Sequence, residues 1–230
     1  MLLNIQYKEY TCFQTKNEWD HVIVSALRRI ESTNVGSLLI SELNKYIRSG
    51  YNVNISNYSS SKNFQYPHFS SKDNTIFIPD TPYFIKVPVL NEELLEGVED
   101  ETFHKIINCQ PLDDKIDLDL CSSFSIFKFQ PIVVILFHEL VHCLRLFCKM
   151  NTRSMFEEES TIYGIKGNTL IINNIIITEN SFRKELGLGA RISHDSKDIY
   201  VYNTRVDKDD EKFVFSNAEL KNLFLQEHIK

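Results

Sequence analysis

Residues 131–150 read PIVVILFHELVHCLRLFCKM. From Ile132 to Phe137 the residues are apolar all round a helix, which is typical of a helix buried on every side. Pro131 suits the first turn of such a helix, where the missing N–H has no partner in any case. We therefore expect a buried helix from residue 131 to about residue 150.

His138, Glu139 and His142 form a His-Glu-x-x-His motif inside this helix. Residues four apart lie on one face of a helix, so His138 and His142 can place two imidazoles on one zinc ion. Glu139 lies one step around, close enough to deprotonate a water held at that ion. The alternative is two core histidines beside a chance glutamate, but burying three such groups without partners would cost several kcal/mol. The motif therefore indicates one half of a zinc peptidase site.

The composition of the chain limits its class. It has 230 residues, 43% of them hydrophobic and 24% charged, which is ordinary for one soluble globular domain spanning residues 1–230. A net charge of −6 argues against nucleic acid or a membrane surface as the main partner, and a monomer is expected. No apolar run has the length of a transmembrane helix, and no secretory signal peptide is visible. The five cysteines include no Cys-x-x-Cys pair, which favours a reducing compartment.

The remaining pattern mixes helices and strands and predicts an α+β fold. Besides the buried helix, helices are expected at residues 17–31, 35–48, 154–163 and 181–186, with a short helical turn at 92–97 and a C-terminal helix capped by Ser216 and Glu219. Strands are expected at residues 51–55, 75–78, 84–87, 199–203 and 213–215, and a β-hairpin with a type I′ turn at 169–177. Residues 58–73 and 110–119 are expected to be loops.

A catalytic zinc ion needs a third protein ligand, and such peptidases usually take it from a later helix. Glu157, Glu158 and Glu159 follow His142 after a length that allows a turn and a second helix. Each residue of a helix is rotated by about 100° from the next, so only one of the three can face the ion. The alternative is a solvated acidic first turn. The residues themselves leave the choice among the three open.

A transition state with oxyanion character also needs a positively polarised partner. Arg191 and His194 follow the glycine-rich turn at residues 187–189 and are the candidates for this role. The alternative is an ordinary surface arginine and histidine.

These motifs resemble those of the NleD-like effectors, a family of zinc metallopeptidases that bacterial pathogens inject into host cells by type III secretion. The similarity runs from the first helix to about Ser196. It rests on the segments 82–88 (PYFIKVP), 110–112 (QPL), 121–124 (CSSF), 137–142 (FHELVH) and 178–187 (TENSFRKELG). The resemblance implies a protease delivered to the host cytoplasm that cuts mitogen-activated protein kinases of the JNK and p38 classes in the activation loop, which dampens inflammatory signalling. It also allows a short flexible N-terminal secretion segment.

The layout is also similar to that of the light chains of clostridial neurotoxins. In those enzymes a Glu-Glu-x-x-Thr segment follows the motif and its first glutamate binds zinc, which makes Glu157 the preferred third ligand and Glu158 the reserve. They also use a late Arg-x-x-Tyr pair at the transition state. Arg191 fits this pair, whereas His194 stands where a tyrosine is expected, and an imidazole can also donate a hydrogen bond to an oxyanion.

The predicted architecture is zincin-like, with a small mixed sheet packed on the buried motif helix. A substrate strand is expected to add to an exposed sheet edge, at residues 75–78 or 84–87. Two alternatives stay open: a zinc protease with another host target, and a non-catalytic zinc-stabilised binding module. The intact Glu139 argues against the second, because a purely structural site needs no general base.

Overall fold

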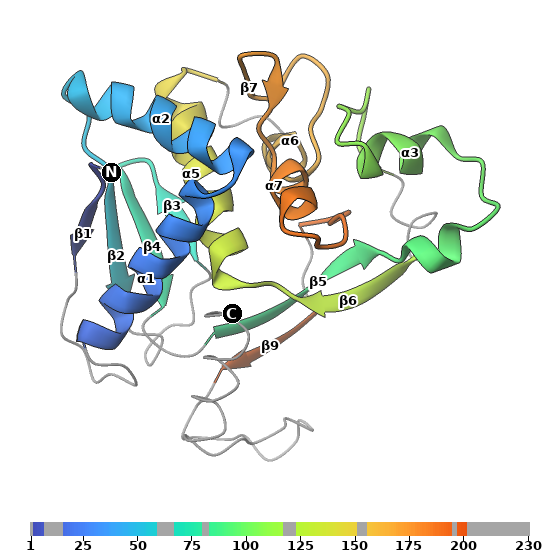
Figure 1. The fold of residues 1–230 in the computed structure, drawn as a ribbon, viewed down its shortest axis with the longest axis horizontal. Coiled ribbons are helices and arrows are strands. Elements are labelled where there is room, and N and C mark those ends of the chain that lie inside the picture. The colour runs from blue at the N-terminus through green and yellow to red at the C-terminus, as the bar shows by residue number, and fades with distance from the viewer. Residues whose placement is uncertain are drawn as a thin grey trace.

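A computed structural model describes residues 2–6, 16–58, 67–79, 83–116, 123–150, 156–194 and 197–201. It is a mixture of small sheets and helices, as the sequence predicts (Figure 1). The helices are α1 (Lys16–Glu31), α2 (Asn34–Arg48), the 3₁₀ turn η1 (Glu92–Leu95), α3 (Glu101–Ile107), α5 (Ile132–Phe147), α6 (Glu157–Ile162) and α7 (Glu179–Glu185). The strands are β1 (Asn4–Gln6), β2 (Asn54–Tyr58), β3 (His68–Ser70), β4 (Thr75–Pro79), β5 (Tyr83–Leu90), β6 (Ser125–Phe129), β7 (Ile171–Ile172), β8 (Ile175–Ile176) and β9 (Lys197–Val201).

The larger sheet has four strands in the order β1-β2-β4-β3 and lies on the left of Figure 1. Strands β1, β2 and β4 are parallel, and β3 pairs with β4 in the antiparallel direction. The sheet is therefore mixed, and its strands β3 and β4 both contact α5. These contacts confirm that a small mixed sheet packs on the motif helix.

The second sheet has three antiparallel strands in the order β6-β5-β9 and crosses the lower part of Figure 1. Strand β6 leads directly into α5 through Gln130 and Pro131, so this sheet fixes where the motif helix begins. Shortly before β9 in the chain, Arg191 bridges to Val89 of β5. The second sheet thus carries both the entry to the motif helix and the late loop that follows α7.

The main hydrophobic cluster joins α1, α2, α5 and α7 to strands of both sheets, and a second cluster lies around α3 and the end of α6. Helices α1 and α2 pack on α5, and α7 packs on α5 from another direction. The turn between α1 and α2 is tight: Thr33 caps α2 by accepting a hydrogen bond from the Gly36 N–H, and a Cβ at Gly36 would lie 2.0 Å from the Ile30 carbonyl oxygen. Only glycine allows that approach. The motif helix is consequently enclosed by two helices, a sheet and α7.

The structure corrects several expectations. The helices near residues 17–31, 35–48, 154–163 and 181–186 are confirmed, as is the hairpin, whose turn residues Asn173 and Asn174 have φ of 50° and 64° as a type I′ turn requires. The expected strand at 51–55 begins later, at Asn54, and the expected loop at 58–73 contains β3. Strands β1 and β6 and helix α3 were not predicted. The expected strand at 213–215 and the C-terminal helix lie outside the described residues.

The predicted substrate edges are wrong. Residues 75–78 belong to β4, which lies between β2 and β3, and residues 84–87 belong to β5, which lies between β6 and β9. Each strand has a neighbouring strand on both sides, so neither forms an edge of its sheet. In the described part of the chain, the edges of the two larger sheets are β1, β3, β6 and β9. None of its helices is both long enough and apolar enough to cross a bilayer.

Candidate metal centre

Helix α5 is buried on nearly every side, as predicted. Pro131 is its N-cap, and the Pro131 carbonyl accepts hydrogen bonds from the N–H groups of Val134 and Ile135. His138 and His142 are 5% and 8% exposed, so both imidazoles lie inside the protein. Buried imidazoles need partners for both ring nitrogens, and those partners define the site.

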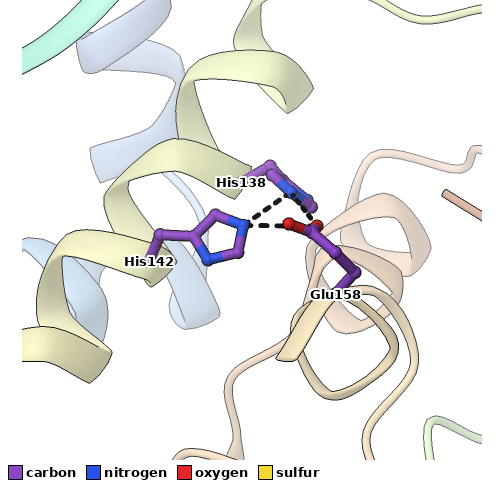
Figure 2. A group of neighbouring side chains, drawn as sticks. All are labelled: His138, His142 and Glu158. Carbon is purple, nitrogen blue, oxygen red and sulfur yellow. Dashed lines mark hydrogen bonds and ion pairs between the residues drawn. The ribbon is translucent and has the colours of Figure 1, made fainter. Parts of the chain in front are cut away.

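Three ligand atoms converge between α5 and α6 (Figure 2). The Nε2 atoms of His138 and His142 are 3.0 Å apart. The Oε2 atom of Glu158 lies 3.3 Å from the first and 3.4 Å from the second. His138, His142 and Glu158 therefore form a buried cluster that could hold a metal ion.

The other ring nitrogen of each histidine faces a carboxylate. His138 Nδ1 lies 2.9 Å from Glu179 Oε2, and His142 Nδ1 lies 3.1 Å from Glu157 Oε1. A carboxylate accepts hydrogen bonds, so each Nδ1 carries a proton, and each Nε2 is directed at the other imidazole and at Glu158. Glu158 Oε2 is itself buried without a hydrogen-bond donor. Three ligand atoms that meet in this way need a cation between them.

The groups of the cluster also shift one another's pKa values. Burial alone lowers the pKa of His142, but its contacts with the carboxylates of Glu157 and Glu158 outweigh burial and raise the pKa to about 10. Burial likewise raises the pKa of Glu158, yet the two imidazoles hold that pKa well below its usual range. A proton and a metal ion therefore compete for the same place, which is typical of metal ligands.

Glu139 lies beside the cluster on the same helix and is 7% exposed. Burial raises the pKa of its carboxyl group, while the charges of His138 and His142 partly oppose the rise. His68 on β3 also lowers the Glu139 pKa through its charge, which indicates that β3 approaches the motif helix here. A carboxyl group whose pKa is raised toward neutrality is suited to accept a proton and release it again.

The three glutamates of α6 have three different partners. Glu158 faces both imidazoles, Glu157 contacts only His142 through the far ring nitrogen, and Glu159 forms an ion pair of 2.6 Å with Lys115. The preference for Glu157 as the third ligand therefore does not match the geometry, and the reserve candidate Glu158 is the residue that the structure brings to the cluster. The reason is the rotation of about 100° between consecutive helix residues, which separates the roles of neighbouring side chains.

Glu179 is a site residue that the sequence did not reveal. It is fully buried at the start of α7 and accepts bonds from His138, from Arg183 Nη1 at 3.2 Å and from Arg191 Nη1 at 2.8 Å. Burial raises its pKa, but the charge of Arg191 and the contact with His138 hold the pKa well below its usual range. The available signal was an acid directly after the capping Thr178 in a segment already singled out by resemblance.

Arg191 is 3% exposed, which excludes the alternative of an ordinary surface arginine. Besides Glu179, its guanidinium donates to the Ser193 carbonyl at 2.7 Å and to the His194 carbonyl at 2.9 Å. Arg191 thus connects the metal cluster to the late loop. Its oxyanion role stays a prediction.

His194 lies at the rim of the cluster. Its side chain is 61% exposed, and its Nε2 lies 3.6 Å from Glu158 Oε2. The structure therefore brings the expected histidine to the third ligand, although the catalytic role of His194 stays a prediction.

Comparison with protein-family models, with curated proteins and with solved structures gave no match. The assignment of this site therefore depends on its own geometry and chemistry.

Proposed function

We propose that this chain is a zinc-dependent endopeptidase with a zincin-like arrangement of sheet and motif helix. The observation that carries the proposal is the convergence of two Nε2 atoms and one carboxylate oxygen beside a buried glutamate. Two histidines and one glutamate are the ligand set of catalytic zinc in several metallopeptidases.

The ligand types and their spacing are compatible with zinc. Zinc bonds to nitrogen and oxygen are about 2.0–2.2 Å long, so two ligands of a tetrahedral site are about 3.3–3.6 Å apart. The two distances to Glu158 Oε2, 3.3 and 3.4 Å, fall in this range, and the distance between the two Nε2 atoms is shorter, at 3.0 Å. In the described part of the chain three such atoms converge, which is the protein contribution to a catalytic site, whereas structural zinc sites use four.

His138, His142 and Glu158 would hold the ion, with Glu179 and Glu157 fixing the two imidazoles. When bound, zinc would supply a Lewis acid that lowers the pKa of water and polarises a carbonyl group. Glu139 would take a proton from the attacking water on its carboxylate and pass it to the leaving amine. Arg191 and His194 are proposed to stabilise the oxyanion.

An extended substrate segment would add to the edge of β3. This strand pairs only with β4 among the described strands, contacts α5 and brings His68 near Glu139. Addition of a strand to a sheet edge satisfies the backbone of the substrate while its side chains reach the site.

The resemblance to NleD-like effectors supports a narrower proposal. On that basis the chain is secreted by a type III system into the host cell cytoplasm, and its substrates are mitogen-activated protein kinases of the JNK and p38 classes. Another host signalling protein is the alternative target.

The test is mass-spectrometric mapping of new protein N-termini in host-cell lysate, comparing the zinc-loaded wild type with Glu139→Gln. We expect new termini only with the wild type, and equal zinc content in both proteins, because the substituted amide keeps the shape of the side chain and loses the base. Cleavage by the variant at the wild-type rate would contradict the mechanism. Termini within kinase activation loops would support the narrower proposal.

The alternative is a non-catalytic zinc-stabilised binding module, which would need a fourth ligand beside the three atoms of the cluster. His194 Nε2 lies close enough to Glu158 for a fourth ligand to be considered, at 3.6 Å from its Oε2. X-ray absorption of the zinc-loaded protein would distinguish the two functions, because a closed site would contain three imidazoles and the proposed peptidase two.

A further inference from the structure

Arg145 is a buried cation that the proposed chemistry does not use. It lies on α5 three residues after His142, and none of its surface is exposed. Burial lowers its pKa, while the charges of Glu157 and Glu158 raise it. A guanidinium is unfavourable in a protein interior unless its charge and its N–H groups are compensated. Its place beside the acids of α6 therefore suggests a role in the site.

The guanidinium bonds to a neutral partner. Arg145 Nη1 donates to the Asn168 carbonyl at 2.7 Å, and Nη2 donates to Asn168 Oδ1 at 3.2 Å. Asn168 Nδ2 in turn donates to Ser160 Oγ at 3.0 Å. Ser160 belongs to α6, two residues after Glu158. Three side chains thus connect the motif helix to the helix that carries the third ligand.

The turn that carries Asn168 is itself fixed. The Asn168 N–H donates to the Ile165 carbonyl at 2.9 Å, and Thr169 Oγ1 donates to the same carbonyl at 2.7 Å. Gly164 follows Tyr163, the C-cap of α6, and has φ of +91°; a Cβ there would lie 2.9 Å from Thr169 Oγ1. Asn168 is consequently held at a defined position relative to α6.

The neutral link leaves the carboxylates free to face the imidazoles. Among the described residues, the hydrogen bonds of Arg145 go to Asn168 and none goes to Glu157 or Glu158. A direct bidentate pair with either acid would compete with its contact to His142. The charge of Arg145 instead acts on both acids through space. Asn168 links Arg145 on α5 to Ser160 on α6 and so fixes the position of α6 relative to α5.

We propose that Arg145 is a positioning residue for the third metal ligand. Its link through Asn168 and Ser160 fixes the rotation of α6 about its own axis. Because one residue corresponds to about 100° of rotation, fixing this angle selects Glu158 over its two neighbouring glutamates. The inference rests on the metal site of the proposed function, and it adds how Glu158 is selected as the third ligand.

The test measures zinc affinity of the full chain by competition with a chromogenic chelator. Arg145→Gln should lower the affinity about 10- to 100-fold, the usual loss when a group behind a metal ligand is removed. Asn168→Ala should lower it in the same direction, because it keeps the charge and breaks the link. Leu144→Ala is the matched control, since Leu144 is a core residue of the same helix and should leave the affinity unchanged.

A second readout follows the ligand geometry directly. The visible absorption of the Co²⁺-loaded protein should change in Arg145→Gln and Asn168→Ala and should match the wild type in Leu144→Ala. Should Arg145→Gln fail to fold, Asn168→Ala carries the test alone.

Wild-type affinity and absorption in both link variants would overturn the inference and leave the proposed metal site intact. Equal losses of affinity in Arg145→Gln and Leu144→Ala would also overturn it, because affinity would then follow stability alone. A wild-type protein that binds no zinc would overturn the proposed function and this inference together.

Discussion

The two histidines of the metal cluster lie on one helix, but the Nδ1 atom of each contacts a different carboxylate. His138 is held by Glu179, which is fully buried and bonded to Arg183 and Arg191. His142 is held by Glu157, whose side chain is 20% exposed. One side of the site is thus part of the core, and the other belongs to a six-residue helix near the surface.

The difference shows how one chain can combine His138, whose orientation is fixed by buried groups, with His142, whose orientation depends on a group near the surface. On the His138 side, two guanidinium groups and an imidazole share one carboxylate, and removing any partner leaves a buried charge uncompensated. On the His142 side, water can replace a lost partner because the carboxylate reaches the surface. We therefore expect the His138 side to determine stability and the α6 side to determine which glutamate meets the metal.

The largest expected effect is on stability. Glu179→Ala should lower the free energy of unfolding by about 3–5 kcal/mol, because Arg183 and Arg191 would remain buried without their shared carboxylate. Glu157→Ala should lower it by less, because the Glu157 side chain is 20% exposed and water can take its place beside His142. Urea-induced unfolding of the metal-free proteins measures both values. Equal losses in the two variants would show that the two sides do not differ.

The next largest effect is on metal affinity, and it distinguishes the roles of the three glutamates of α6. Glu157→Ala should weaken zinc binding about 10- to 100-fold, because it removes only the group that orients His142. Glu158→Ala should weaken binding further, since it removes a ligand. Competition with a chelator measures both affinities, and Glu159→Ala serves as a control because Glu159 pairs with Lys115. A larger loss in Glu157→Ala would return the ligand role to Glu157.

Glu179 and His142 should respond to pH in opposite directions in the metal-free protein. Burial lowers the pKa of His138, but its contacts with Glu158 and Glu179 outweigh burial and raise it, so His138 should follow His142. The pKa of Glu179 lies below its unfolded value of 4.5, so its stabilisation is present above that pH and is lost as pH falls through the lower folded value. The pKa of His142 is raised from 6.5 to about 10, so its stabilisation is present below pH 6.5 and is lost as pH rises toward 10.

Unfolding free energies measured between pH 3 and 10 check this prediction, with Glu157→Gln beside the wild type. The variant should lose less stability between pH 6.5 and 10, because one of the groups that raises the His142 pKa is gone. Its behaviour below pH 4.5 should match the wild type. A parallel decline of both proteins above pH 6.5 would contradict the assignment of this stability to His142.

The smallest expected effect on stability is that of His194, at the exposed side of the cluster. His194→Ala should change the free energy of unfolding by about 0.5 kcal/mol or less, as is usual for an exposed side chain. If His194 contacts the oxyanion, the same variant should lower kcat while KM stays near the wild-type value. His194→Tyr, which introduces another hydrogen-bond donor, should restore part of kcat. An unchanged kcat in His194→Ala would remove His194 from the catalytic residues.

The sequence predicted the motif helix well because its signals are local. An apolar run, a proline at its start and two histidines four residues apart depend only on neighbouring positions. The hairpin was equally clear, since Asn173 and Asn174 both tolerate positive φ. Strand β1 escaped notice because its three residues are too few to show a period, and β3 was hidden in a polar segment.

The parts of the site that were missed depend on tertiary contacts. Glu157 and Glu158 differ by one position, and which of them faces the cluster is set by the rotation of α6 relative to α5. The role of Glu179 depends on α7 approaching His138 from 41 residues away in the sequence. No local pattern carries either piece of information.

The order of the site along the chain has a consequence for folding kinetics. The three ligand atoms come from positions 138 to 158, and the orienting Glu179 follows soon after. By contrast, pairing β1 with β2 joins Ile5 to Ile55, and pairing β5 with β9 joins Ile85 to Ile199. Because the entropy cost of closing a loop grows with its length, the ligands of the site are the cheaper contacts to form. We therefore expect the contacts between α5 and α6 to form before β5 pairs with β9.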